Sequence, residues 1–403
     1  MARFVIIGAG QAGATLVETL RKRGFDGEIT MIGEEPVPPY QRPPLSKGYL
    51  LGDMDLERLF LRPAAWYADH NVTLHTSVRA SKIDPKAQMV MLNNGKTLRY
   101  DKLALATGAE PHRLPARIGG ELAGVYSVRS LADVDAMKSE FTPGRRVLVI
   151  GGGYIGLEAA AVAAKLGLKA TLVEMADRIL QRVAARETSD YFRQLHGGHG
   201  VELVEGVGVD ALLGEGQITG ARLTDGRELA VDFAIVGVGV APRTALAEAA
   251  GLEIENGIKT DAMARTSDSH IYAAGDCAST PVSGAQVRIE SVGNAIDQAQ
   301  IAAANMMGEA EAYTPKPWFW SDQFDVKLQI AGLNTGYDSV VVRGEGASVS
   351  HWYYKGNTLL AVDAMNDPRA YMVGKRLIEA GKSPAAEMVA DTSVDLKAIM
   401  ASG

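Results

Sequence analysis

Two glycine-rich stretches carry the residues of this chain most suited to chemistry. They are residues 8–13 (GAGQAG) and residues 151–156 (GGGYIG), and each follows an apolar run and precedes a helical pattern. The first glycine of such a stretch permits a tight turn, the second lets the backbone approach a pyrophosphate, and the third lets the helix pack on the strand. The helix N-terminus attracts the phosphate charge. Two copies therefore predict two bound dinucleotides, although a single copy could be an ordinary glycine turn.

An acidic residue ends the next apolar run after each glycine-rich stretch. Glu34 follows the first copy and Glu174 follows the second. A carboxylate at this position accepts hydrogen bonds from a ribose, and it repels the extra phosphate of NADPH. Glu174 therefore favours NADH. NADPH remains an alternative, because Arg178 lies nearby and an arginine usually binds the extra phosphate of NADPH.

The elements that must position these residues alternate between strands and helices. The apolar runs 3–8, 28–34, 102–108, 145–152, 169–174, 233–239 and 270–276 are typical of strands buried on both faces. Residues 12–24 and 155–167 have helical patterns that end at a glycine. This alternation predicts parallel sheets with right-handed crossovers.

The last part of the chain has a different pattern. From about residue 320 the apolar residues alternate as in antiparallel hairpins, with a turn at residues 355–357 and a closing helix over 369–381. We therefore expect an α/β protein with two Rossmann-like dinucleotide-binding domains and an α+β C-terminal domain.

Composition excludes several classes of function. The chain has 403 residues, a net charge of −7 and one cysteine, Cys277. It can form no internal disulfide, no CxxC redox pair and no cysteine-based metal centre, and we expect no metal. The negative charge argues against nucleic acid or an anionic membrane as the main partner. We expect a cytoplasmic protein, since the N-terminus shows no leader or membrane segment and one thiol suits a reducing compartment.

The chain resembles the NADH-dependent, FAD-containing ferredoxin reductases, which are two-dinucleotide-binding-domain flavoproteins that include the putidaredoxin reductase-like and aromatic-ring dioxygenase reductase-like enzymes. The similarity runs through nearly the whole chain. The resemblance rests on the segments PPYQRPPLSKGYL (38–50), ALATGAEP (104–111), VLVIGGGYIGLE (147–158), IYAAGDCA (271–278), VRIESVGNAIDQA (287–299) and PWFWSDQFD (317–325).

This resemblance implies a glutathione-reductase-like fold, with an FAD-binding domain in two segments (1–110 and 242–316), an NADH-binding domain (111–241) and a C-terminal α+β domain (317–403). It also implies two cofactor sites. The residues implied at FAD are Gly8, Gly10, Gln11, Ala12, Gly13, Glu34, Arg42, Lys47, Ala80, Ala106, Thr107, Gly108, Arg129, Asp276 and Val292. Those implied at NADH are Gly151, Gly153, Tyr154, Ile155, Gly156, Glu158 and Glu174. Arg42 and Lys47 could instead lie in a solvated loop, and Asp276 could be a helix N-cap.

Four residues are implied in the reaction itself. Lys47 would lie near the reactive face of the flavin, and Glu158 would pair with Lys47 and bind the nicotinamide amide. Tyr154 would cover the flavin until NADH displaces it, and Trp320 would lie beside the flavin on the docking side. The alternatives are that Glu158 only complements the helix dipole and that Tyr154 and Trp320 only pack in the core.

The implied activity is NADH:ferredoxin oxidoreduction. A flavin takes two electrons as hydride and releases them singly, which a one-electron iron–sulfur acceptor requires. The implied partner is a small acidic [2Fe–2S] ferredoxin that serves a cytochrome P450 or a ring-hydroxylating dioxygenase, and the reductase would be a monomer or weak dimer.

Three alternatives remain open: a rubredoxin reductase, an NADH oxidase or peroxidase, and a regulatory NADH-sensing flavoprotein of the apoptosis-inducing-factor type. Peroxidases and oxidases of this fold use a cysteine in the region where this chain has Ser46. Cys277 is expected to pack as a small apolar residue without a redox role.

Overall fold

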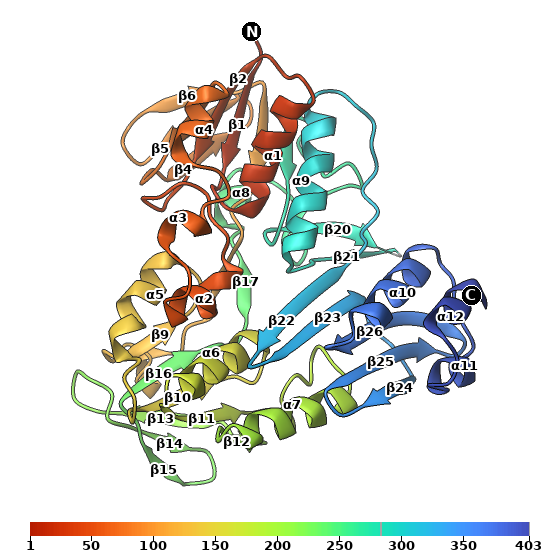
Figure 1. Ribbon diagram of the computed structural model, residues 1–403. Helices are drawn as coiled ribbons and strands as arrows, with labels where there is room; N and C mark the ends of the chain where they lie inside the picture. Colours follow the sequence, from red (N-terminus) through yellow and green to blue (C-terminus); the bar gives the residue numbers. More distant parts are fainter. Residues whose placement is uncertain (283, 403) are drawn as a thin grey trace. The chain divides into compact units, whose positions relative to one another are not determined.

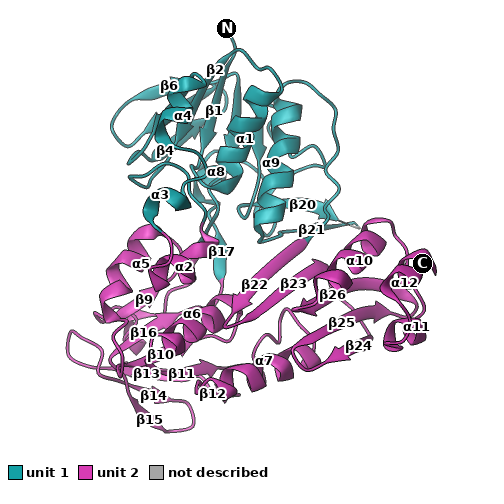
Figure 2. Ribbon diagram, in the orientation of Figure 1, with its two compact units in different colours: residues 1–41, 55–110, 240–317 teal, residues 42–54, 111–239, 318–403 magenta. Residues whose placement is uncertain are grey.

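The computed structural model describes residues 1–282 and 284–402, which fold into two compact units (Figure 2). Unit 1 contains residues 1–41, 55–110 and 240–317, and unit 2 contains residues 42–54, 111–239 and 318–403. The segment 42–54, which the expected boundaries assign to the first FAD segment, thus packs with unit 2. The four-domain division stays a prediction.

Unit 1 is built on a parallel five-stranded sheet in the order β19-β7-β1-β2-β3, of which Figure 1 labels β1 and β2. Its strands are β1 (Arg3–Ile7), β2 (Glu28–Ile32), β3 (Val72–His75), β7 (Lys102–Leu105) and β19 (Ile271–Ala273). Helices α1 (Gln11–Lys22) and α9 (Val292–Met306) pack together on one face, because their alanines and leucines form one core with the sheet. The predicted helix over 12–24 is thus confirmed, with Gly24 just past its end in the left-handed region.

Smaller elements complete unit 1. The strands β4 (Ala80–Asp84), β5 (Met89–Leu92) and β6 (Thr97–Arg99) form an antiparallel sheet. A second small sheet contains β18 (Ile258–Lys259), β20 (Ala278–Val282) and β21 (Ala285–Val287), while β8 (Ala109–Pro111) pairs with β17 (Val240–Pro242). The remaining helices are α3 (Leu56–Leu59), α4 (Ala64–Asp69) and α8 (Ala245–Ala249).

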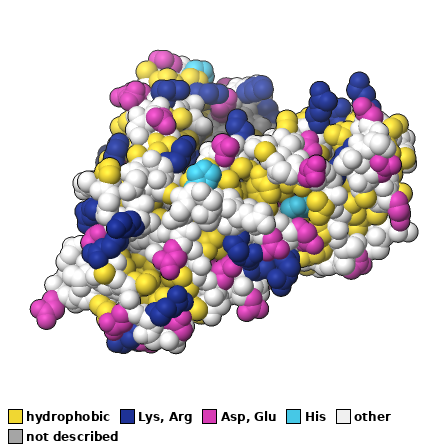
Figure 3. Space-filling model, turned by 60° about the horizontal axis from the view of Figure 1, so that its bottom comes forward, with side chains coloured by type: hydrophobic (Ala, Val, Ile, Leu, Met, Phe, Trp, Pro, Cys, Tyr) yellow, Lys and Arg dark blue, Asp and Glu magenta, His cyan; other side chains and the backbone are white. Residues whose placement is uncertain are grey.

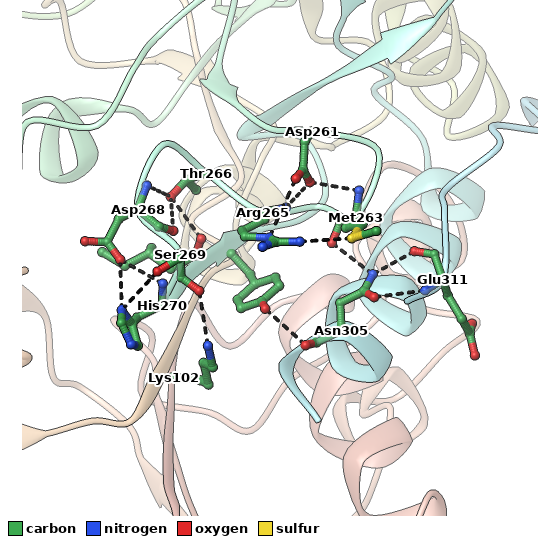
Figure 4. Close-up of polar contacts among 12 residues, drawn as sticks. Lys102, Asp261, Met263, Arg265, Thr266, Asp268, Ser269, His270, Asn305 and Glu311 are labelled. Carbon is green, nitrogen blue, oxygen red and sulfur yellow. Dashed lines mark hydrogen bonds and ion pairs between the residues drawn. The ribbon is translucent and has the colours of Figure 1, made fainter. Parts of the chain in front are cut away.

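The loop that leads into β19 is fixed by its own polar groups (Figure 4). Asp261 accepts from the backbone N–H groups of Met263 and Arg265, and Asp268 accepts from that of His270. Asn305, near the end of α9, donates to the carbonyl oxygens of Met263 and Glu311. These bonds fix the start of the strand that precedes Asp276.

Unit 2 contains a second parallel sheet of the same kind, in the order β12-β11-β10-β16-β9. Its strands are β9 (Val125–Ser127), β10 (Arg146–Ile150), β11 (Lys169–Glu174), β12 (Glu202–Glu205) and β16 (Phe233–Val236). Its helices are α2 (Gly48–Leu51), α5 (Leu131–Met137), α6 (Tyr154–Lys165) and α7 (Arg186–Gly198), with 3₁₀ turns η1 (Pro43–Ser46), η2 (Ala116–Ile118) and η3 (Lys138–Glu140). A small antiparallel sheet contains β13 (Val209–Leu213), β14 (Gly220–Leu223) and β15 (Glu228–Ala230).

The C-terminal part of unit 2 is an antiparallel sheet in the order β22-β23-β26-β25-β24. It contains β22 (Trp318–Gln323), β23 (Val326–Gly332), β24 (Ser339–Glu345), β25 (Ser348–Lys355) and β26 (Thr358–Met365). Helices α10 (Pro368–Glu379), α11 (Ala386–Ala390) and α12 (Leu396–Ser402) share an apolar core with this sheet. The α/β class, the antiparallel C-terminal sheet and its closing helix are therefore as predicted.

Three features of the described residues concern possible partners: the distribution of surface charge, the length and polarity of the helices, and the grouping of metal-binding side chains. On the face in Figure 3, basic and acidic side chains are intermingled, without one continuous basic area. Within residues 1–282 and 284–402, no helix is long and apolar enough to cross a bilayer. The same residues contain no group of three or more His, Cys, Asp or Glu side chains that could hold a metal ion.

Candidate functional site

The first glycine-rich turn has the geometry of a phosphate cradle. Gly8 has a φ of +118°, and a Cβ there would lie 2.0 Å from the carbonyl oxygen of Ala106. A Cβ on Gly13 would lie 2.0 Å from the carbonyl oxygen of Gly8. Gly10, in contrast, has nothing within 4 Å of its Cβ position, just before the first N–H groups of α1. The outer glycines are therefore required by packing, and the middle one leaves space for a ligand.

The second turn repeats this division of roles. Gly151 has a φ of +109°, and its Cβ would lie 2.4 Å from the carbonyl oxygen of Gly237. A Cβ on Gly156 would lie 2.0 Å from the carbonyl oxygen of Gly151, while Gly153 has nothing within 4 Å. Because the same local geometry occurs in both units, each unit fits one pyrophosphate at a helix N-terminus.

The other residues implied at FAD divide between the two units. Unit 1 holds Gln11 and Ala12 in the first turn of α1, Ala80 at the start of β4, Ala106 to Gly108 after β7, Asp276 after β19 and Val292 at the start of α9. Unit 2 holds Arg42, Lys47 and Arg129. Arg42 Nη1 donates to the backbone oxygen of Arg129 at 2.7 Å, so these two residues are brought together.

Glu34 lies two residues beyond the end of β2 and is exposed. Arg243 Nη1 donates to its Oε2 at 2.8 Å, and Arg79 lies 3.9 Å from its Oε1. The backbone oxygen of Arg243 in turn accepts from Thr107 Oγ1 at 2.7 Å. Arg243 therefore connects two of the residues implied at FAD, although no motif in the sequence points to it.

Glu158 is the most constrained carboxylate among the implied site residues. It lies one turn after Tyr154 on α6 and is only 5% exposed. Its Oε2 accepts from Ser46 Oγ at 2.8 Å and its Oε1 from Ser321 Oγ at 2.7 Å, while Lys47 Nζ lies 3.1 Å from Oε1. Burial raises the pKa of Glu158, and Lys47 and the two hydroxyls oppose that rise. The structure thus brings Lys47 and Glu158 together, as the resemblance implies.

Lys47 contacts several groups of unit 2. It follows the 3₁₀ turn η1, where two prolines restrict the backbone. Its ammonium also lies 3.8 Å from Asp322 and 5.9 Å from the ring centroid of Trp320. Trp320 is half-buried and stacks on Trp318 with 5.4 Å between ring centroids. The reading of Lys47 as a solvated loop residue is therefore wrong.

Tyr154 begins α6 and packs against the ring of Phe319 on β22, with 4.8 Å between ring centroids. Burial raises the pKa of Tyr154 well above its usual value, and the negative potentials of Asp363 and Tyr353 add to this effect. Ile155, the next residue, is exposed. These contacts are compatible with both a core role and a lid, so the lid stays a prediction.

Glu174 ends β11, as predicted, and is bound to the glycine-rich turn beside it. Its Oε2 accepts from the backbone N–H of Gly152 at 2.6 Å, and its Oε1 accepts from that of Ala176 at 2.7 Å. Arg178 donates instead to the carbonyl oxygens of Ala184 and Ala185. The guanidinium of Arg178 is thus hydrogen-bonded within its own loop.

Cys277 is fully buried, as expected for a small apolar residue. Its Sγ lies 3.5 Å from the carbonyl oxygens of Leu105 and Ala274, and burial raises the pKa of the thiol. A protonated, buried thiol is a poor nucleophile. Cys277 is therefore not a redox group of the kind that a disulfide reductase or peroxidase needs.

Comparison with known proteins gives two family matches. The pyridine nucleotide-disulphide oxidoreductase model matches residues 2–299, and the reductase C-terminal model matches residues 318–400. The chain is similar to rhodocoxin reductase of Rhodococcus erythropolis, with 42% identity over 99% of this chain and 94% of the relative. It is 40% identical to the ferredoxin–NAD(+) reductase component of the anthranilate 1,2-dioxygenase system of Burkholderia cepacia, over 98% of this chain and 99% of the relative.

Among solved structures, the chain is similar to putidaredoxin reductase in its covalent complex with putidaredoxin. The TM-score is 0.96 and the identity 38%, over 99% of this chain and 98% of the other.

Proposed function

The chain belongs to the pyridine nucleotide-disulphide oxidoreductase family, and from that membership we propose that it is an FAD-dependent NADH:ferredoxin oxidoreductase. The proposed partner is a [2Fe–2S] ferredoxin that serves a P450 or a ring-hydroxylating dioxygenase. Two similar proteins support this proposal: the ferredoxin–NAD(+) reductase component of a dioxygenase system, and putidaredoxin reductase, which was solved in a complex with putidaredoxin. We also propose that the enzyme acts in the cytoplasm, as a monomer or weak dimer.

One observation carries the proposal: the buried Glu158, held by Lys47, Ser46 and Ser321 on the helix of the second glycine-rich turn. A family disulfide reductase would need paired cysteines, but the chain has only Cys277. In the segment where peroxidases of this fold carry a cysteine, the hydroxyl of Ser46 donates to Glu158 instead. The site is thus equipped to bind and orient a dinucleotide rather than to form a sulfur intermediate.

The residues have distinct proposed roles. The two middle glycines, Gly10 and Gly153, leave room for the pyrophosphates of FAD and NADH, and Glu34 and Glu174 accept from the riboses. The carboxylate of Glu158 accepts from the nicotinamide amide and so fixes the plane of the ring. The ammonium of Lys47 keeps Glu158 ionised and supports negative charge near the reaction. Bound FAD supplies the chemistry that converts a two-electron hydride into single electrons.

Steady-state oxidation of NADH, with and without an added [2Fe–2S] ferredoxin, tests this proposal. We expect slow NADH oxidation by the protein alone and strong stimulation by the ferredoxin. Fast turnover of oxygen or peroxide without any carrier would instead indicate an oxidase or peroxidase. Stimulation by a rubredoxin but by no ferredoxin would indicate a rubredoxin reductase.

A further inference from the structure

Three buried polar side chains form a hydrogen-bonded row that starts at Glu158. Ser321 Oγ lies 2.7 Å from Glu158 Oε1, and Gln323 Nε2 lies 3.1 Å from Ser321 Oγ. Gln323 Oε1 lies 2.8 Å from His196 Nε2. Ser321, Gln323 and His196 are all fully buried. The row connects α6, which carries Glu158, with β22 and α7 in the same unit.

The chemistry of the groups fixes the direction of each hydrogen bond. An ionised Glu158 only accepts, so the single proton of the Ser321 hydroxyl points to it. Ser321 Oγ must then accept from the amide nitrogen of Gln323, which turns the amide oxygen toward His196. The Nε2 of His196 must therefore carry its proton. Every donor in the row thus directs positive polarity toward Glu158.

His196 is suited to the end of such a row. Burial lowers its pKa to about 4, so the imidazole is neutral at pH 7. Its Nδ1 is buried and has no hydrogen-bond partner among the described residues. With the proton on Nε2, the unpartnered Nδ1 is only a lone pair, whereas the other tautomer would bury an unpaired N–H and also leave Gln323 Oε1 without a donor. Packing and hydrogen bonding therefore select the same tautomer.

The contacts of Glu158 are divided unequally between its two oxygens. A carboxylate has about four acceptor sites, two on each oxygen. Ser321 donates to Oε1, and the ion pair with Lys47 is also made at Oε1, whereas the hydrogen bond from Ser46 is to Oε2. One acceptor site therefore remains on Oε2.

We propose that Ser321, Gln323 and His196 are positioning residues that keep Glu158 ionised and leave its Oε2 to accept from the carboxamide of NADH. This inference rests on the proposed function. Other titratable groups lie on the elements packed around α6: Lys47 after η1, Asp322 on β22 and Glu174 at the end of β11, with Tyr154 on α6 itself. Ser321 connects Glu158 through Gln323 to the buried His196.

The first test needs no cofactor turnover. ¹⁵N-histidine NMR of the FAD-loaded protein without NADH reports the tautomer of His196, with the resonance assigned by His196→Gln. We expect a neutral imidazole protonated at Nε2 from pH 6 to 8. In Ser321→Ala the fixed orientation of Gln323 is lost, so the Nε2 resonance should shift. The proposed direction of the hydrogen bonds is wrong if His196 is protonated at Nδ1. It is also wrong if the Nε2 resonance of His196 has the same position in Ser321→Ala as in the wild type.

The second test is the pH dependence of flavin reduction by NADH, measured by stopped flow. Loss of one hydrogen bond to the carboxylate should move the midpoint of the acid limb upward by about one pH unit in Ser321→Ala. Gln323→Leu should move it less, because Ser321 can still donate. The matched control is Ser350→Ala, since Ser350 is equally buried on β25 and its hydroxyl accepts from Trp352 Nε1.

The outcomes separate this inference from the proposed function. An unchanged midpoint in Ser321→Ala, or an equal shift in Ser350→Ala, overturns the positioning role even when NADH reduces the protein normally. If NADH fails to reduce the wild-type flavin, the proposed function fails. The NMR test then still decides whether the row has the proposed direction.

Discussion

Lys47 and Glu158 form a shielded ion pair with 3.1 Å between Nζ and Oε1, and their side chains are only 16% and 6% exposed. Loss of one partner from such a pair leaves a buried charge uncompensated. In Lys47→Met we therefore expect the pKa of Glu158 to rise and flavin reduction by NADH to slow on the order of 10²-fold. Stopped-flow absorbance at saturating NADH measures the rate.

The same variant should keep its FAD, because the glycine-rich turn of unit 1 is unchanged. Lys327→Met is the control, since Lys327 is an exposed lysine of the same unit. Equal rates in Lys47→Met and the wild type would contradict a role for Lys47 in the reaction, and loss of FAD alone would indicate a purely structural role.

The middle glycines of the two turns give paired predictions. Alanine at Gly10 or Gly153 meets no atom within 4 Å and needs no positive φ, so both variants should fold normally. The added methyl group occupies the space proposed for a pyrophosphate. Gly10→Ala should therefore be purified with little FAD, whereas Gly153→Ala should keep FAD and lose affinity for NADH. Flavin content and NADH titrations measure both effects, and each variant is the control for the other.

Gly13→Ala should behave differently from Gly10→Ala. Its Cβ would lie 2.0 Å from the carbonyl oxygen of Gly8, so the backbone must shift. We expect this variant to lose thermal stability as well as FAD. If Gly10→Ala binds FAD as the wild type does, the assignment of the first turn to the pyrophosphate is wrong.

Much of this arrangement could be predicted from the sequence, because its signals are local. The continuous Val and Ile runs of β1 and β10 identify strands buried on both faces, and the glycine spacing identifies the turns that follow. The edge strands β3 and β12 are not predicted by the sequence pattern, because they are short and contain polar residues. Helix α7 is not predicted either, since few of its residues are apolar.

The positioning of Glu158 could not be predicted in the same way. Ser46, Ser321 and His196 come from three distant parts of the chain, and no spacing rule connects them. One signal was present: Phe319, Ser321 and Gln323 alternate along β22, which places them on one face of the strand. Only the fold shows that this face meets Glu158.

The choice between NADH and NADPH depends on Glu174. In Glu174→Ala we expect the apparent Kd for NADH to rise about 10-fold, because hydrogen bonds from the ribose to a charged group are lost. The preference for NADH over NADPH should relax without reversing, since Arg178 stays bound to Ala184 and Ala185. Glu202→Ala, an exposed acid on the adjacent strand β12, is the control. An unchanged ratio of the two affinities would remove Glu174 from the specificity site.

Asp363 should make stability depend on pH. Burial raises its pKa to about 6, from 3.8 in the unfolded chain, although Thr188 and Tyr353 donate to it. Between pH 4 and 6 the folded protein therefore binds more protons at Asp363 than the unfolded chain does. For this reason, the contribution of Asp363 to the free energy of unfolding falls by roughly 3 kcal/mol as the pH rises from 4 to 6. His351, whose pKa burial lowers to about 4, acts in the opposite direction over about pH 4 to 6.5.

Asp363→Asn removes only the first of these contributions. Its thermal midpoint should therefore rise more steeply between pH 4 and 6 than that of the wild type. Asp325→Asn, at an exposed position, should follow the wild-type profile. Parallel profiles for Asp363→Asn and the wild type would show that Asp363 is not a protonated acid in the folded protein at pH 5.

The reoxidation of the NADH-reduced protein tests the central claim most directly. In an anaerobic stopped-flow experiment, the reduced protein is mixed with an oxidised [2Fe–2S] ferredoxin, and a parallel mixture receives air-saturated buffer. We predict that at least one ferredoxin from a P450 or dioxygenase system reoxidises the flavin much faster than oxygen does. If every ferredoxin tested is slower than oxygen, the protein is not a ferredoxin reductase.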